Sequence, residues 1–113
     1  MYIIDEYITA LKEFLYKNID DIMSYYSIES SEHARAELID ILELTCKSIS
    51  IDNYMEHGDP VLNIDQLDTC IHRACTEFHL NELVSKGLVE SKLDLDTGQF
   101  VYRATDLGRS LIS

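Results

Sequence analysis

Hydrophobic residues recur every three or four positions along the first quarter of the chain, from Ile4 to Tyr26. This spacing matches the period of an α-helix, which turns once in about 3.6 residues. The pattern predicts one long amphipathic helix over about residues 3–26, or two helices with a break near Asn18.

A second helical pattern follows a short polar connection. Ser30 or Ser31 can cap this helix, because a serine side chain accepts a hydrogen bond from a free backbone N–H of the first turn. The apolar face of the pattern predicts that the helix ends near residues 46–48. Residues 50–60 are then expected to form a loop, with Gly58-Asp59-Pro60 as its turn.

The next pattern predicts two short helices. Asp65 can cap the first and Thr76 the second, so that the chain turns at Ala74-Cys75-Thr76. Gly87 is placed to close the second helix, since glycine readily adopts the left-handed backbone conformation found there.

Two strand-like runs come next, over residues 88–95 and 99–105. Asp96-Thr97-Gly98 lies between them and is typical of a hairpin turn. On the second run Phe100, Tyr102 and Ala104 share one face. Thr105 can then cap a short last helix. Two short helices followed by a hairpin, after longer helices, is the order of a winged helix-turn-helix.

The residues around this hairpin resemble a known family. The run from Leu80 to Glu90 is similar to the end of the recognition helix and the start of the wing in MarR-like and PadR-like regulators. The run from Tyr102 to Arg109 is similar to the end of their wing, where a tyrosine, an arginine, a small residue, a threonine and then a glycine recur. The resemblance covers about the last third of the chain. It implies a dimeric transcription regulator that places its recognition helix in the major groove of DNA.

Three departures from the family pattern bear on DNA binding. The turn at residues 74–76 lacks the frequent glycine, the expected recognition helix presents no lysine or arginine, and the wing tip at Asp94-Leu95-Asp96-Thr97 is acidic. The candidate phosphate contacts are then Arg73 at the turn with Lys92 and Arg103 on the hairpin. Thr76 and Asn81 are the candidates for reading base edges, since asparagine pairs well with adenine.

Net charge changes the range of partners. The chain of 113 residues carries 21 Asp and Glu against 9 Lys and Arg, a net charge of −12. Affinity for nucleic acid comes largely from clustered lysine and arginine that displace counterions from phosphates. An acidic surface instead favours a basic protein partner. The sequence thus supports a second hypothesis, an acidic protein-binding module or inhibitor of phage type, or a nucleic-acid mimic, that uses the winged-helix fold for protein contacts.

Tyrosines gather in the acidic N-terminal half, which holds six of the seven. Tyrosine is enriched at protein interfaces because it combines a large apolar area with a polar tip. Tyr7 and Tyr26 fit the helix core, whereas Tyr2, Tyr16 and Tyr25 fall off the apolar stripe. These three are the candidate residues of a protein interface, either in a homodimer through the first helix or with another protein.

The residues that favour metal binding or catalysis lack a familiar spacing. Cys75 and His79 lie four apart, with Cys70 and His72 nearby, but the set matches no zinc signature. No phosphate loop, serine elbow or paired-carboxylate motif occurs. We therefore expect no metal, no cofactor and no enzymatic activity, with the cysteines serving as small core residues.

These observations predict a mainly α protein with a small β-hairpin wing, a winged helix-turn-helix with an N-terminal helical extension. We expect a single domain over residues 1–113, with N-terminal helices over 1–49 that supply a dimerisation or partner surface and a winged helix-turn-helix over 61–113. No apolar run is long enough to cross a bilayer and the N-terminus is acidic, so we expect a cytoplasmic protein without membrane contact. The expected function is a small winged-helix transcription regulator that binds DNA as a homodimer, and the alternative is the acidic protein-binding module.

Overall fold

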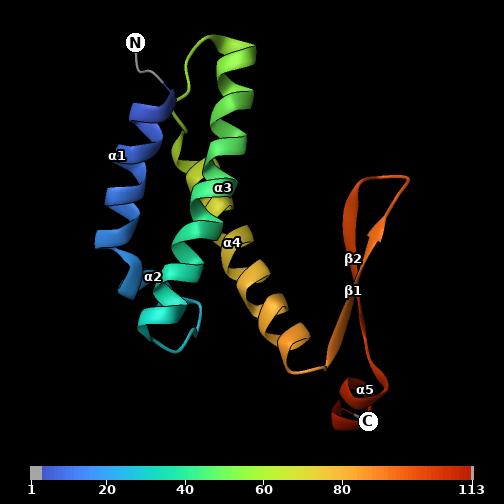
Figure 1. Ribbon diagram of the computed structural model, residues 1–113. Helices are drawn as coiled ribbons and strands as arrows, with labels where there is room; N and C mark the ends of the chain where they lie inside the picture. Colours follow the sequence, from blue (N-terminus) through green and yellow to red (C-terminus); the bar gives the residue numbers. More distant parts are fainter. Residues whose placement is uncertain (1–3, 113) are drawn as a thin grey trace. The chain divides into compact units, whose positions relative to one another are not determined.

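The computed structural model describes residues 4–112 and is mainly helical, with one two-stranded hairpin near the C-terminal end (Figure 1). The chain divides into two compact units, Met1–Glu77 and Phe78–Ser113, which we call the helical unit and the hairpin unit. The predicted fold class is confirmed at this level, as a helix-rich chain that ends in a hairpin.

The first apolar stripe forms two helices, α1 over Ile4–Lys17 and α2 over Ile19–Tyr25. They meet at Asn18, whose side-chain amide donates a hydrogen bond of 2.9 Å to the carbonyl oxygen of Phe14. This side-chain bond takes up a carbonyl that would otherwise continue the helical ladder. Of the two alternatives that the sequence left open, the broken helix is therefore confirmed.

The next helix, α3, runs over Glu32–His57. Ser31 caps it as predicted, because its hydroxyl accepts a hydrogen bond from the N–H of Ala34 at 3.0 Å. The predicted end near residues 46–48 is wrong, since the helix continues to Gly58, which closes it in the left-handed conformation at φ 72°. The extra turns are held by Ser50, which is fully buried and donates a hydrogen bond of 2.7 Å to the carbonyl of Pro60.

Helix α4 runs without interruption over Ile64–Ser85, so the prediction of two short helices with a turn at residues 74–76 is wrong. Ala74 and Cys75 are completely buried in the middle of the helix, and the Thr76 hydroxyl donates to the carbonyl of His72 at 2.9 Å. Threonine in a helix interior often bonds back in this way instead of capping a new helix. The stretch contains no glycine or proline that would stop the helix.

The start of α4 is also capped differently from the prediction, by Asn63 in place of Asp65. The Asn63 side chain accepts a hydrogen bond from the N–H of Gln66 at 2.8 Å, and the Gln66 side chain accepts one from the N–H of Asn63 at 3.0 Å. This reciprocal pair is a capping box. Asn53 of α3 exchanges hydrogen bonds with the Gln66 side chain, so the cap also ties α4 to α3.

The core of the helical unit is built from one face of each of its helices. Side chains from α1 and α2 meet the long inner face of α3, and the first half of α4 adds small residues. The buried members are Ile8 and Leu15 of α1, Ile19 and Met23 of α2, Leu38, Leu42 and Cys46 of α3, and Cys70, Ala74 and Cys75 of α4.

In the hairpin unit, α4 ends at Ser85, and Gly87, which has φ 73°, closes it as predicted. Strands β1 over Val89–Asp94 and β2 over Gln99–Ala104 pair antiparallel, with Leu93 opposite Phe100 and Glu90 opposite Arg103. The predicted turn is confirmed, and Gly98 supplies its left-handed residue at φ 71°.

Thr105 fixes the base of the hairpin to the short helix α5, which spans Asp106–Ile112. Its hydroxyl accepts a hydrogen bond from the N–H of Gly108 at 3.1 Å, so the predicted cap is confirmed. The same hydroxyl donates to the carbonyl of Gly87 at 2.6 Å, and the Thr105 N–H donates to the carbonyl of Leu88 at 3.0 Å. One residue thus joins the end of α4, the start of β1 and α5.

Candidate functional site

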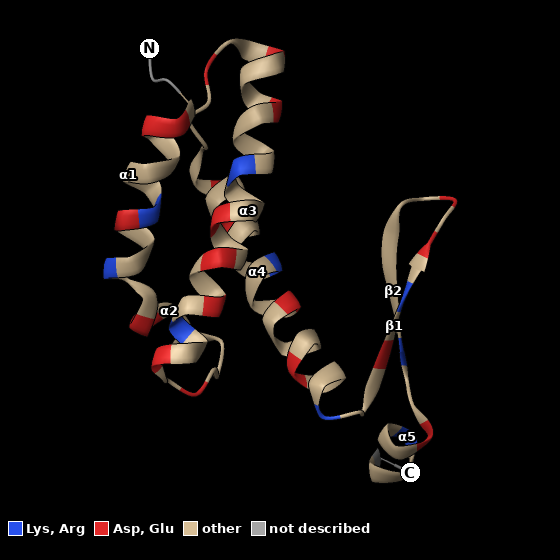
Figure 2. Cartoon of the chain, viewed as in Figure 1, with Lys and Arg blue, Asp and Glu red and all other residues tan. Residues whose placement is uncertain are grey.

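Charge is distributed very unequally between the two units. Residues 1–77 hold five Lys and Arg against sixteen Asp and Glu, a net charge of −11. Residues 78–113 hold four against five, a net charge of −1. Acidic positions recur along α1, α2, α3 and α4 (Figure 2). The helical unit therefore repels polyanions and attracts cationic partners.

Two of the basic residues of the helical unit are neutralised by acidic neighbours. Lys12 forms a salt bridge of 2.9 Å with Glu43, and Arg35 forms one of 3.0 Å with Asp20. The hydrogen bond to Glu43 raises the pKa of Lys12, and the hydrogen bond to Asp20 raises that of Arg35. These pairs leave an acidic surface with few cations available to a phosphate backbone.

A groove crosses the helical unit between α1 and α2 on one side and α4 on the other. We call it the helical groove. Phe14, Ile22, Tyr25, Tyr26, Leu67 and Ile71 supply its apolar lining.

Asp21 and Asp68 are exposed carboxylates at the same groove, and Arg73 is its one basic lining residue among those described. Phe14 is 53% exposed and Tyr25 is 82% exposed, although both carry large aromatic surface. Aromatic side chains next to carboxylates are suited to hold an apolar segment that carries positive charges.

The structure separates the three tyrosines that the sequence singled out. Tyr25 lines the helical groove, whereas Tyr16 is 60% exposed and lies outside the groove lining. Tyr2 lies outside the described residues. The ring of Tyr25 stands edge-on to that of Tyr26, with 5.0 Å between centroids. Tyr26 in turn lies 6.0 Å from the ring of His72 on α4, so an aromatic row spans the groove from α2 to α4.

Most of the groove residues were not predicted from the sequence. Phe14 belongs to the apolar stripe of the first helix, so periodicity alone predicts that it is buried. Asp21, Leu67 and Asp68 carry no motif. Asp20 and Asp21 do precede the pair Tyr25-Tyr26 by a few residues, but this local signal does not say which segment of the chain faces them.

The candidate DNA contacts are divided between the units. Arg73 and Thr76 are exposed residues of α4 in the helical unit, while Asn81, Lys92 and Arg103 lie in the hairpin unit. Thr76 already donates its hydroxyl proton to the His72 carbonyl, and Asn81 is half-buried. Neither unit by itself therefore brings these five residues into one site.

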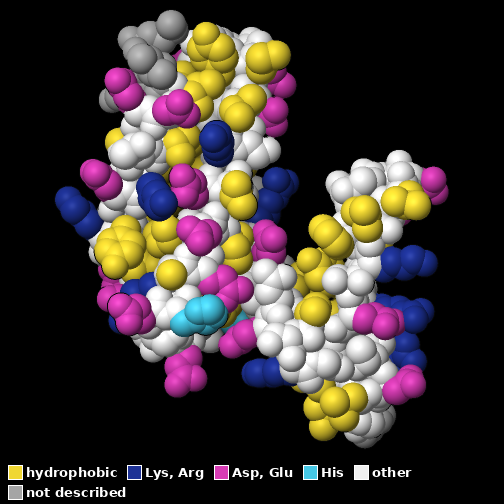
Figure 3. Space-filling view, viewed as in Figure 1, with side chains coloured by type: hydrophobic (Ala, Val, Ile, Leu, Met, Phe, Trp, Pro, Cys, Tyr) yellow, Lys and Arg dark blue, Asp and Glu magenta, His cyan; other side chains and the backbone are white. Residues whose placement is uncertain are grey.

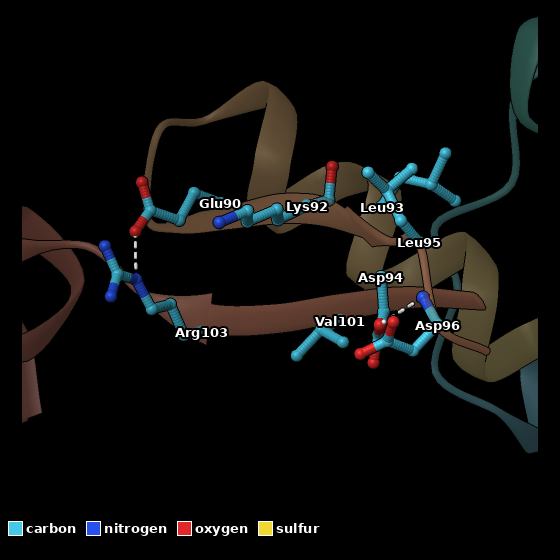
Figure 4. Close-up of a pocket in the computed structure, with 9 residues that line it drawn as sticks. Glu90, Lys92, Leu93, Asp94, Leu95, Asp96, Val101 and Arg103 are labelled. Atoms are coloured by element: carbon cyan, nitrogen blue, oxygen red, sulfur yellow. Dashed lines mark hydrogen bonds and ion pairs between the residues drawn. The ribbon is translucent and has the colours of Figure 1, made fainter. Parts of the chain in front are cut away.

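One face of the hairpin is charged. The register places Glu90 opposite Arg103 and Lys92 opposite Val101, and residues opposite each other share a face. Arg103 forms an ion pair with Glu90, and Lys92 extends along the same side of β1 (Figure 4). A hollow that runs from Arg103 towards the acidic turn is lined by residues of both faces. Its positive end is thus small and partly neutralised.

The other face of the hairpin is apolar. It carries Val89 and Ala104 at the base, then Ser91 opposite Tyr102, and Leu93 opposite Phe100 towards the turn. The base is half-buried, but Leu93 is 44% exposed and Phe100 is 62% exposed. Leu95, in the turn, is 87% exposed. A surface that is uncovered in this way is typical of a protein contact.

The three cysteines are free thiols that belong to the core. Burial raises the pKa of Cys75 to about 11, so it is protonated at neutral pH. The side chains of Cys46 of α3 and Cys70 of α4 share a hydrogen bond. This bond and burial both raise the pKa of Cys46. Within the described residues, no group of three or more His, Cys, Asp or Glu side chains is placed to hold a metal ion.

No helix in the described part of the chain is long and apolar enough to cross a lipid bilayer. The chain matches no protein-family model, no curated protein and no solved structure.

Proposed function

We propose that the protein is an acidic protein-binding module, which binds a basic, amphipathic segment of a partner protein in the helical groove. The observation that carries this proposal is the net charge of −11 on the unit that contains an aromatic-lined groove with two carboxylates. A partner of this kind would place apolar side chains against Phe14 and Tyr25 and lysine or arginine near Asp21 and Asp68. Such a module suits an inhibitor or a nucleic-acid mimic.

We further propose that the frame is a variant winged helix. The hairpin after a helix, the turn at Gly98 and the Thr105 cap support it. The uninterrupted α4 is the main difference, because it removes the turn that lets a recognition helix project by itself. In this frame α4 contributes to a protein-binding groove, and the DNA-reading role of its second half is lost.

The second candidate is a winged-helix regulator that binds DNA as a dimer. One observation favours it, namely that Lys86, Lys92, Arg103 and Arg109 gather in a hairpin unit whose net charge is only −1. Under this hypothesis the charged face of the hairpin contacts phosphates, and Arg73, Thr76 and Asn81 of α4 supply the remaining contacts.

Two exposed tyrosines, one in the groove and one outside it, give a matched test of the groove. The probe is a labelled synthetic Leu/Lys amphipathic peptide, and its binding is followed by fluorescence anisotropy. Tyr25→Ala removes an aromatic groove residue, and Tyr16→Ala removes an exposed tyrosine from outside the groove. Truncation of an aromatic anchor at an interface often costs about 2 kcal/mol, or roughly 30-fold in affinity. We expect a loss of this order for Tyr25→Ala and little change for Tyr16→Ala.

Two double variants that each remove two negative charges give a second matched test of the groove. The Asp21→Asn/Asp68→Asn variant removes two charges at the groove, and the Asp52→Asn/Glu56→Gln variant removes two exposed charges from α3 outside it. We expect the groove variant to weaken peptide binding several-fold more than the α3 variant, since Coulomb attraction falls with distance and is screened by salt. Equal losses in the two variants would mean that the peptide senses net charge alone, which contradicts a groove site.

A further inference from the structure

The apolar face of the hairpin has no cover in the described structure of its own unit. Leu93 and Phe100 lie opposite each other on the two strands, and both are exposed. An isolated two-stranded hairpin is marginally stable in water, and a hydrophobic face must pack on another element to become stable. Hydrophobic side chains line the hairpin in the space-filling view (Figure 3). This apolar face is therefore expected to pack against another protein surface.

We infer that a second copy of this chain covers the face, so that the protein is a homodimer built through its hairpin units. The distribution of charge favours this arrangement. Two chains of net charge −12 repel each other, but the net charge is −11 on the helical unit and only −1 on the hairpin unit. Approach through the hairpin units brings the least charge together, and charges beyond about 8 Å are largely screened at physiological salt.

The exposed apolar area of the hairpin unit also favours this arrangement. The exposed apolar side chains of the hairpin unit include Leu93, Leu95 and Phe100 on the hairpin and Leu107 and Leu111 on α5. Given their exposed fractions, these five present on the order of 400 Å² of apolar surface per chain. A stable interface buries about 800 Å² per partner, of which roughly 56–65% is apolar. Their combined apolar area thus approaches the apolar content of a standard dimer interface.

This assignment places the dimer interface on a different part of the chain from the tyrosines of the first helix. It uses none of the residues that line the helical groove. Because the interface is apolar and the copies carry like charge, added salt should strengthen self-association. Binding of a basic partner in the groove should weaken with salt, so the two associations respond in opposite directions.

Two neighbouring residues of β2 provide the test. Phe100 is 62% exposed on the apolar face, and Val101 is 53% exposed on the charged face. The full chain and its Phe100→Ser and Val101→Ser variants are compared by sedimentation velocity over a concentration series, with circular dichroism as the check of folding. We expect a dimer for the natural chain, a weakening of at least about 10-fold for Phe100→Ser, and less than about 3-fold for Val101→Ser.

A second variant guards against a folding defect at Phe100. Leu95→Ser changes a turn residue that is 87% exposed, and it should also weaken the dimer. A natural chain that stays monomeric at all concentrations would overturn the inference and would indicate that the chain covers its own hairpin. A dimer that survives both Phe100→Ser and Leu95→Ser would also overturn it, by placing the interface elsewhere. Neither result bears on peptide binding in the groove.

Discussion

Gly108 of α5 is packed so closely against the start of β1 that it has no room for a side chain. A Cβ atom added there would lie 2.1 Å from the carbonyl oxygen of Leu88 and 3.0 Å from its carbonyl carbon. Carbon atoms in ordinary contact are separated by about 3.5–4.0 Å. The Gly108→Ala variant must therefore move α5 away from the hairpin by more than about 1 Å.

The expected cost follows from the contacts that this movement breaks. Overpacking costs about 1–3 kcal/mol. The hydrogen bonds from Thr105 to the Leu88 and Gly87 carbonyls, at 3.0 and 2.6 Å, are the first to stretch, and each contributes on the order of 1 kcal/mol. We expect a loss of about 2–4 kcal/mol in the stability of the hairpin unit. Helix propensity alone acts in the opposite direction, since alanine in place of glycine stabilises a helix by about 1 kcal/mol.

The sign of the change thus decides between packing and propensity. Hydrogen exchange of the amides in β1 and β2, read by mass spectrometry, reports the stability of the hairpin unit directly. Ser110→Ala is the control, because Ser110 is exposed on the same helix and should change stability by less than about 0.5 kcal/mol. Unchanged or increased protection of the strands in Gly108→Ala would refute the packing of α5 on Leu88.

Four further outcomes are expected for Ser50, Cys75 and Tyr7, which are buried or half-buried in the helical unit. Ser50→Ala should cost about 1–3 kcal/mol in urea unfolding, since it leaves the buried Pro60 carbonyl without its 2.7 Å partner, whereas Ser48→Ala on the exposed side of α3 should be nearly neutral. Cys75 is fully buried, so its thiol should react with a disulfide reagent only when the chain unfolds. Its pKa rises from 9.0 to about 11 on folding, so the stability present below pH 9 should decline as pH rises towards 11, and Cys75→Ala should remove this part of the pH dependence of urea unfolding. Burial also raises the pKa of Tyr7, so its contribution should fall as pH rises beyond 10, which spectrophotometric titration of the tyrosines can follow.

Local signals in the sequence were sufficient for the ends of several elements. Ser31, Gly87, Gly98 and Thr105 each occupy a position where one residue type meets a defined backbone need, so a cap or a turn could be assigned without tertiary information. The stripe of the first helix likewise identified Ile8 and Leu15, among others, as core residues.

The errors arose where a residue can satisfy two structures equally well. Thr76 can cap a new helix or bond back to the preceding turn, and the sequence around it does not distinguish the two. Residues after Ser48 carry mixed polarity, and the helix persists there because Ser50 has a buried acceptor at Pro60, ten residues away. The groove could not be predicted from the sequence either, since Tyr25 and Asp68 come to line one groove only in the folded helical unit.

The acidic helical unit is proposed to bind a basic protein segment and not nucleic acid. The most direct test measures labelled random-sequence duplex DNA and the labelled Leu/Lys peptide in parallel with the full chain, from about 50 to about 200 mM salt. We expect the peptide to bind, with affinity that falls as salt rises, and the duplex to show no binding at the lowest salt. Duplex binding that weakens linearly in log salt, and is lost when Lys92 and Arg103 are made neutral, would contradict this account and favour the DNA-binding regulator.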